Sequence, residues 1–540
     1  MGIPSYFSYI VKNHANIIRK LSANPVQIHN LYLDCNSIIY DSFYKMEATT
    51  MTNETSNEII RKTIHTIIQY IQLLKPSNNV IIAFDGVAPV AKLEQQRTRR
   101  YKSTYQTSIS KSIFKNTAPD PWNTTAITPG TLFMKNLDEQ VTNHFQNIQP
   151  YGVNSIIVSG SNICGEGEHK IFDYIRNNPQ QHTDLNTVIY GLDADLIMLS
   201  INHLPITPNI YLFRETPEFI KSINSELEPN ETYMLDIPEL TKTITSNMNN
   251  DEELTNQQQK NRIYDYIFMC FFLGNDFMPH FPAINIRTGG VDKMLNAYKA
   301  TIGNSNENLT NGNKIYWKNV RKLVDFLAKN EHDFIKQEYK KRDRREKQKM
   351  PNITPKDKMD YFNNIPTYER AVEKFINPFK ENWQYRYYKT LFDVEMTEDR
   401  KKQLCMNYLQ GLEWTMKYYT SGCADWKWCY YYNYPPLLED LIHYIPYFDT
   451  ELIDNKPSNP VSNLVQLSYV LPRQSLHFLP KDLYNALIKY KSEQYVTNCD
   501  FAWAYCKYFW ECHPLLPHID IDELECFVFN NHSTHSTKEQ

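Results

Sequence analysis

The 540-residue sequence lacks long apolar runs and targeting segments, which excludes several classes of protein. Its strongest apolar run, from Ile267 to Gly274, is far shorter than the roughly 20 apolar residues that a membrane helix needs. The N-terminus has no basic region followed by an apolar stretch, and Tyr6 stands where a myristoylation signal has Ser or Thr. We therefore expect a protein without membrane attachment that acts in the cytoplasm, with the nucleus as the alternative.

The sequence also has no closely paired cysteines and few glycines. None of the ten cysteines forms a Cys-x-x-Cys pair, and the nearest approach to a zinc-binding spacing, from Cys499 to His513, lies in an aromatic stretch typical of a core. This favours a reduced intracellular protein without zinc. There are only 15 glycines, against 38 tyrosines and 26 phenylalanines. We expect most of these rings in the core and a few exposed as stacking platforms.

An excess of positive charge is absent as well. The chain has 57 basic and 61 acidic residues, which gives a net charge of −4. Proteins that coat nucleic acid are normally basic, so the balance disfavours that class. It is compatible with an enzyme in which an acidic metal site lies beside a local basic patch.

The first part of the sequence predicts an α/β fold. Short apolar runs typical of buried strands alternate with segments of helical periodicity. The expected strands lie at 31–33, 80–84, 156–158 and 188–190, and the clearest helices at 57–74 and 132–145. This alternation predicts a mainly parallel sheet covered on both faces. Residues 215–260 are polar and are interpreted as an excursion from the core.

Acidic residues follow the predicted strands at their carboxyl ends. This holds for Asp34, Asp85, Asp193 and Asp195, while Glu166 and Glu168 open a helix soon after the strand 156–158 and Asp276 follows the apolar segment that ends in FFLGND. Each alone is typical of a turn or a helix cap, but in a parallel sheet all of them would meet at one edge. Two like charges about 4 Å apart repel by roughly 4 kcal/mol at an effective dielectric constant of 20. Hard divalent cations offset this cost, so the pattern predicts two Mg²⁺ ions, with Mn²⁺ as a substitute.

A basic helix is predicted directly after Asp85. Pro89 suits its first turn, and four side chains then recur on one face: Lys92, Gln96, Arg99 and Arg100. A solvated basic helix would show the same spacing. Its position beside the acids favours a phosphate-binding site, because arginine binds phosphate in a bidentate way.

These residues lie in segments that resemble the Xrn family of 5′→3′ exoribonucleases. The matching strings include MGIPSYF, LYLDCNSII, DGVAPVAKLEQQRTRR, TPGTLFM, GEGEHKIFDYIR, YGLDADLIML, LGNDFMPHFP and GLEWTMKYYTSGCADWKWCYYYNYPP. The resemblance implies a PIN/FEN-like fold with a second, mostly helical region that encloses the active site. It also implies that the seven acids bind metal and that the four residues of the basic face bind a 5′-phosphate. The implied activity is processive hydrolysis of single-stranded 5′-monophosphate RNA to nucleoside 5′-monophosphates.

The resemblance also implies a base-stacking site. Tyr40 stands where the family commonly has a stacking histidine, and either Trp426 or Trp428 would close the other side of the base. Core packing is the alternative for each of these rings. Two departures from the family concern the details of the 5′ pocket: Tyr40 in place of the histidine, and Val90 in place of a frequent arginine. Neither removes a metal ligand.

The expected regions follow from these assignments. They are an α/β catalytic region over 1–300, a charged helical connector over 301–364, a helical, aromatic-rich region over 365–530 and a polar tail over 531–540. Residues 336–349 hold eight basic and three acidic side chains, typical of a solvated helix or, alternatively, of a basic surface along an RNA channel. The chain stops where the second shared region ends, so we expect a short form of the family. We also expect a monomer; a decapping or RNA-processing enzyme could supply its 5′-monophosphate RNA, but nothing in the sequence names one.

Two other functions are compatible with parts of the pattern. A structure-specific flap endonuclease shares the carboxylate cluster, but it needs a glycine-rich hairpin, for which Thr288-Gly289-Gly290 is a weak candidate. A catalytically inactive RNA-binding scaffold would be favoured by the loss of a metal acid, and all seven are present.

Overall fold

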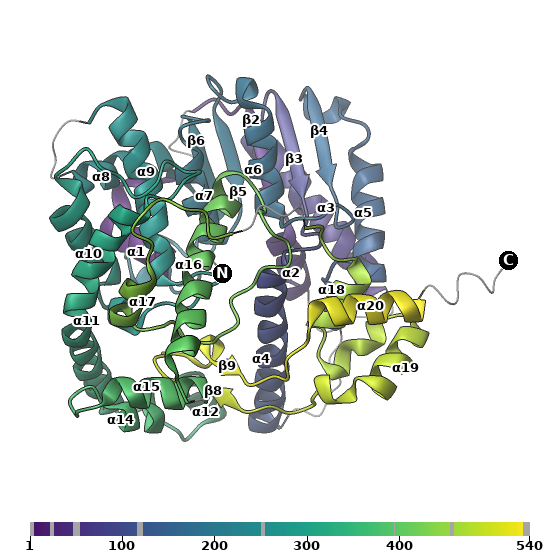
Figure 1. Cartoon of the computed structure of the whole chain (residues 1–540). Helices are drawn as coiled ribbons and strands as arrows, with labels where there is room; N and C mark the ends of the chain where they lie inside the picture. Colours follow the sequence, from purple (N-terminus) through teal and green to yellow (C-terminus); the bar gives the residue numbers. More distant parts are fainter. Residues whose placement is uncertain are drawn as a thin grey trace.

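The structure, a computed structural model, describes residues 5–21, 26–46, 54–115, 122–249, 254–393, 395–453 and 458–532. Figure 1 shows a sheet with helices on both faces, continued by a helical region from α10 onwards. The predicted α/β class is therefore confirmed. Most of the predicted polar tail, from residue 533, lies outside the described residues. No helix within the described ranges is both long and apolar enough to span a membrane.

The central sheet has seven strands in the order β1-β7-β6-β5-β2-β3-β4. Their bounds are β1 Ile18–Lys20, β2 Asn30–Asp34, β3 Asn79–Ala83, β4 Ser155–Ser159, β5 Thr187–Tyr190, β6 Ile210–Glu215 and β7 Thr232–Asp236. Strands β6, β5, β2, β3 and β4 are parallel, β7 pairs antiparallel with β6, and β1 pairs antiparallel with β7 at the edge of the sheet. All four predicted strands are confirmed.

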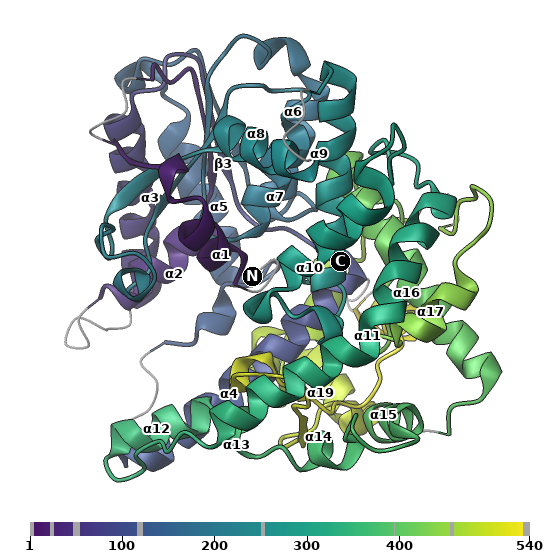
Figure 2. The same cartoon turned by 90° about the vertical axis from the view of Figure 1, so that its left-hand side faces the viewer.

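Side chains alternate between the two faces of the sheet, as the pleat requires. Leu31 and Leu33 pack with one layer of helices, while Tyr32 packs with the other. The first layer contains α2 Asn36–Tyr44, α3 Thr55–Leu74 and α5 Leu132–Phe145. The second contains α1 Tyr6–Asn13, α6 Gly167–Asn177, α7 Asp195–His203, α8 Ile237–Met248 and α9 Asn256–Cys270. Figure 2 shows β3 with α3 on one side and α8 and α9 on the other. Both predicted helices are confirmed as α3 and α5.

Residues 215–260 are not an excursion from the core, so that prediction is wrong. Strand β7 lies within this stretch and pairs with both β6 and β1, and α8 follows it directly. Tyr233 and Leu235 are buried in one layer and Met234 in the other. The prediction failed because it was based on the composition of the whole stretch, in which the polar residues outnumber the few apolar residues of this short strand.

The remaining helices form the second region and a long connecting arm. The arm is α4 Val90–Phe114, which extends from the sheet toward the short pair β8 Phe501–Ala502 and β9 His513–Pro514 (Figure 1). The second region contains α10 Gly290–Tyr298, α11 Trp317–Glu346, α12 Pro355–Asn363, α13 Ile365–Tyr368, α14 Ala371–Ile376, α15 Trp383–Phe392, α16 Glu398–Thr420, α17 Leu438–Tyr444, α18 Asn463–Val470, α19 Lys481–Tyr490 and α20 Ile521–His532.

The basic stretch 336–349 is mostly the end of α11. Part of it is structural, because Arg342 is buried and pairs with Glu373 at 2.6 Å, and Tyr339 is buried beside it. Lys340, Arg344 and the residues after α11 include the exposed charges. Whether these line an RNA channel stays a prediction.

Candidate active site

The carboxyl ends of the parallel strands bring four of the predicted acids to one edge of the sheet. Asp34 is the last residue of β2, and Asp85 follows β3 by two residues. Asp193 and Asp195 follow β5, with Asp195 as the first residue of α7. Since β2 lies between β3 and β5, these ends are neighbours in space.

The carboxylate oxygens approach one another closely. Asp34, Asp85 and Glu168 each place an oxygen within 4.8 Å of the other two. A second group with the same spacing joins Glu166 and Glu168 to a ring nitrogen of His169. These two groups bring together four of the seven predicted acids, and they include a histidine that the prediction missed.

Two glycines allow the backbone to pack this tightly. A Cβ atom on Gly86 would lie 1.7 Å from the carbonyl oxygen of Ile163, so only glycine lets β3 end against the loop before α6. A Cβ on Gly167 would lie 2.6 Å from Oδ1 of Asp34. The Gly167 amide donates to Oδ1 of Asp85 at 2.8 Å, so the first turn of α6 faces the acids with its positive end.

Burial makes the ionised acids costly. Burial, followed by the charge of Asp85, raises the pKa of Asp34 well above its usual value, and burial with Glu166 does the same for Glu168. Oδ1 of Asp34 is buried without a hydrogen-bond partner. An unpaired buried carboxylate oxygen is expensive to maintain, and a cation would satisfy it. The oxygen-rich cluster therefore fits a divalent metal ion.

Because the carboxylates are buried close together, we expect the stability of the metal-free protein to depend on pH. Burial, followed by the charge of Asp276, raises the pKa of Asp195 from 3.8 to about 7. The folded protein thus binds the proton of Asp195 more tightly than the unfolded chain does. The contribution of this proton to the free energy of unfolding is complete below about pH 4 and is lost as the pH rises through about 7. In EDTA, the melting temperature of the wild type should fall over this range more than that of Asp195→Asn. Parallel melting curves for the two proteins would contradict this.

The basic face of α4 lies beside the acids, but its members have different partners. The Lys92 ammonium is buried between Glu166, at 2.5 Å, and Asp276, at 2.7 Å. Burial alone would raise the pKa of Asp276, yet the charge and hydrogen bond of Lys92 act together with other positive charges, Arg99 among them, and hold this pKa below its usual value. Lys92 thus supplies a positive charge inside the cluster, which the helical spacing alone did not indicate.

Two other members of the face, Gln96 and Arg100, are joined by a hydrogen bond. Arg100 donates to Oε1 of Gln96 at 3.5 Å and to the hydroxyl of Thr128 at 2.8 Å. Burial lowers the pKa of Arg100 to about 10, while Arg99 is exposed. Thr128 lies in the TPGTLFM segment noted in the sequence, but only the structure shows that it contacts Arg100.

Two family models match the chain. One is described as the XRN 5′-3′ exonuclease N-terminus and matches residues 1–216; the other, the Xrn1 helical domain, matches residues 256–374 and 366–534. The chain belongs to the XRN 5′–3′ exonuclease family. This confirms the resemblance seen in the sequence, and it places the chain among the hydrolases.

Similar proteins from distant organisms match over most of the chain. A 5′-3′ exoribonuclease 2 homolog of Drosophila melanogaster is 25% identical over 650 residues, covering 96% of this chain and 70% of the relative. The 5′-3′ exoribonuclease 1 of Saccharomyces cerevisiae is 27% identical, covering 89% and 40% respectively. The human 5′-3′ exoribonuclease 1 is 28% identical, covering 99% and 34%. The chain therefore spans between about a third and about 70% of the length of these XRN proteins.

The three rings predicted to stack on a base differ in accessibility. Tyr40, on α2, is half-buried and lies near Arg100. Trp426 is also half-buried, and its carbonyl accepts from the amide of Val90 at 2.9 Å, at the start of α4. Trp428 is only 8% exposed and stacks on Trp414 with ring centroids 5.0 Å apart. Of the two tryptophans, Trp426 is therefore the more exposed.

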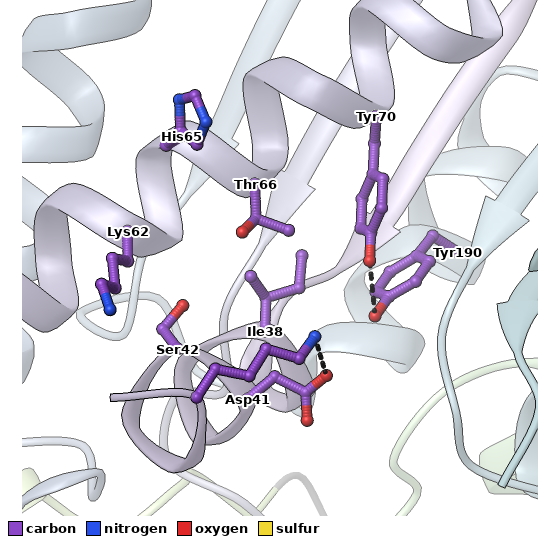
Figure 3. A pocket seen from close by; sticks show the side chains of 9 residues that line it. Ile38, Asp41, Ser42, Lys62, His65, Thr66, Tyr70 and Tyr190 are labelled. Atoms are coloured by element: carbon purple, nitrogen blue, oxygen red, sulfur yellow. Dashed lines mark hydrogen bonds and ion pairs between the residues drawn. The ribbon is translucent and has the colours of Figure 1, made fainter. Parts of the chain in front are cut away.

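A separate pocket lies between α2 and α3 (Figure 3). It has a volume of about 220 Å³ and includes Lys45, Lys62 and Tyr70 in its wall. The Tyr70 hydroxyl approaches that of Tyr190 at 3.5 Å. The seven predicted acids do not line this pocket, so it is distinct from the candidate active site.

Proposed function

We propose that the chain is an exoribonuclease that hydrolyses single-stranded RNA processively from a 5′-monophosphate end and releases nucleoside 5′-monophosphates. The observation that carries the proposal is the position of the basic face of α4 directly beside the buried carboxylates. A terminal phosphate held on that face would present the first phosphodiester bond to the acids. The names of the relatives, all 5′-3′ exoribonucleases, support the same substrate class.

Seven side chains would hold the metal: Asp34, Asp85, Glu166, Glu168, Asp193, Asp195 and Asp276. The chemistry that two Mg²⁺ ions, or Mn²⁺ in their place, supply when bound in such a site is activation of water and stabilisation of the leaving 3′ oxygen. Asn36 donates to Oδ2 of Asp85 at 2.5 Å and so orients that carboxylate. We assign Lys92 both to the neutralisation of Glu166 and to the terminal phosphate, because it belongs to the basic face and its ammonium contacts Glu166 and Asp276.

The 5′ end would be recognised by Lys92, Gln96, Arg99 and Arg100. A compact set of donors can pair with a monophosphate dianion, while a cap or triphosphate is too large for it. An enzyme that exposes a 5′-monophosphate, such as a decapping enzyme, would therefore have to act first. We further expect the chain to act as a monomer and the first base to stack between Tyr40 and Trp426.

The test is to incubate purified protein with uniformly labelled 5′-monophosphate RNA and Mg²⁺, and to separate the products by chromatography. We expect mononucleotides from the earliest times. Internal fragments would contradict the proposal and favour a flap endonuclease, although the family models on both regions lend that alternative no support. Binding without any cleavage would indicate an inactive scaffold.

Arg100→Ala should narrow the preference for 5′-monophosphate RNA over 5′-hydroxyl RNA by about tenfold or more. A charged hydrogen bond contributes roughly 1.5–3 kcal/mol, and each 1.4 kcal/mol corresponds to about a factor of ten. The measurement is the ratio of kcat/KM for the two RNAs. Lys102→Ala is the matched control, because this lysine lies on the same helix and donates to the carbonyl of Trp510 instead. Equal wild-type rates on both RNAs would contradict the pocket.

A further inference from the structure

Helix α16 of the second region contributes two adjacent tyrosines to the carboxylate cluster. The Tyr418 hydroxyl donates to Oε1 of Glu166 at 2.9 Å. The Tyr419 hydroxyl donates to Oδ1 of Asp195 at 3.0 Å. Both tyrosines are buried, with 2% and 1% of their surface exposed. Residues more than 200 positions away in the sequence thus make direct contact with two of the predicted metal ligands.

The ring of Tyr418 is held between two aromatic neighbours. His169, next to Glu168 on α6, stacks on one side with centroids 3.8 Å apart and an interplanar angle of 25°. Trp414 stacks at 4.8 Å and 26°, and Trp428 stacks on Trp414 in turn. The stack therefore runs from the acid-bearing helix into the second region. Because the rings are confined, the Tyr418 hydroxyl has little freedom to move away from its carboxylate.

The ring of Tyr419 is confined by edge contacts. Phe271 meets it at a centroid distance of 5.3 Å and an angle of 69°, and His169 meets it at 5.8 Å and 77°. The hydroxyl of Tyr419 reaches Asp195 from this fixed position. Each tyrosine thus donates a hydrogen bond to one oxygen of a different acid.

We propose that Tyr418 and Tyr419 are positioning residues that hold Glu166 and Asp195 in the orientation needed to bind a divalent cation. The inference rests on the proposed function, in which both acids are metal ligands. A hydrogen bond from a fixed hydroxyl limits rotation of a carboxylate and stabilises its ionised form. The second region is then part of the catalytic centre, because the hydroxyls of Tyr418 and Tyr419 orient two of the metal ligands.

The test removes each hydroxyl and keeps the ring. Tyr418→Phe and Tyr419→Phe should each weaken Mn²⁺ binding by about 10- to 100-fold, as expected for loss of a hydrogen bond to a metal ligand. Binding is measured without RNA, by electron paramagnetic resonance titration of free Mn²⁺. The Mg²⁺ concentration for half-maximal cleavage should rise in parallel, while KM for RNA at saturating Mg²⁺ stays unchanged.

Tyr387→Phe is the matched control. Tyr387 is fully buried, and its hydroxyl donates to the backbone carbonyl of Pro435 at 2.9 Å, so its loss removes a comparable hydrogen bond away from the acids. It should lower the melting temperature and leave Mn²⁺ affinity unchanged. If Tyr418→Phe and Tyr419→Phe behave like this control, the hydroxyls serve folding alone and the inference is overturned.

The result separates this inference from the proposed function. A wild-type protein that binds Mn²⁺ but cleaves no RNA would contradict the proposed function, and the Mn²⁺ affinities of the two variants would still decide the positioning role. A wild-type protein that binds no Mn²⁺ would overturn both. Should one variant fail to fold, the other still measures the effect, because the two hydroxyls contact different acids.

Discussion

Asp195→Asn should reduce RNA hydrolysis by about a thousandfold or more while RNA binding is retained. The substitution keeps the size of the side chain and removes a charged oxygen ligand. Metal ions stabilise charge in such reactions by several kcal/mol, and a loss of about 4 kcal/mol corresponds to about a thousandfold in rate. The measurement is the single-turnover rate on 5′-monophosphate RNA, with binding followed separately by filter retention or fluorescence anisotropy.

The fold of this variant should survive. Asp195 is buried, with its pKa raised to about 7 by burial and by Asp276, so replacing it relieves repulsion in the metal-free protein. EDTA should inhibit the wild type to a similar extent, and Asp193→Ala should resemble Asp195→Asn. Normal turnover in any of these three cases would exclude metal-dependent catalysis through these acids.

Tyr40→Ala should slow degradation by about 5- to 150-fold. An aromatic face under the first base is worth roughly 1–3 kcal/mol, independent of which base is present. Tyr40 lies on α2, just after Asp34, and is half-buried beside Arg100. Tyr40→His should retain most of the activity because a flat ring remains. The measurement is single-turnover decay of 5′-monophosphate RNA, with folding followed by circular dichroism.

The same helix provides the control for this prediction. Tyr44, at the end of α2, is 69% exposed, and Tyr44→Ala should leave the rate unchanged. Trp426→Ala should resemble Tyr40→Ala if the two rings enclose the same base. A well-folded Tyr40→Ala protein that degrades RNA at the wild-type rate would show that Tyr40 is a core residue only.

Contacts between segments that are distant in the chain leave no signal in the local sequence. The strands of the sheet and the acids after them were predictable, because buried strands leave a local apolar signal and parallel strands share an edge. Strand β7 was missed because its three buried residues, 233–235, lie in a polar stretch. Trp426 and Trp428 share one segment and could not be distinguished before their burial was known.

The sequence by itself determined the parallel sheet, the edge at which the acids gather and the family, since these depend on local patterns and their order. The tertiary structure decided which side chains complete the site. Lys92 pairs with Glu166 and Asp276, and the hydroxyls of Tyr418 and Tyr419 reach the acids from α16. Helical spacing shows which face a side chain shares with its neighbours, but its partner depends on how separate elements pack.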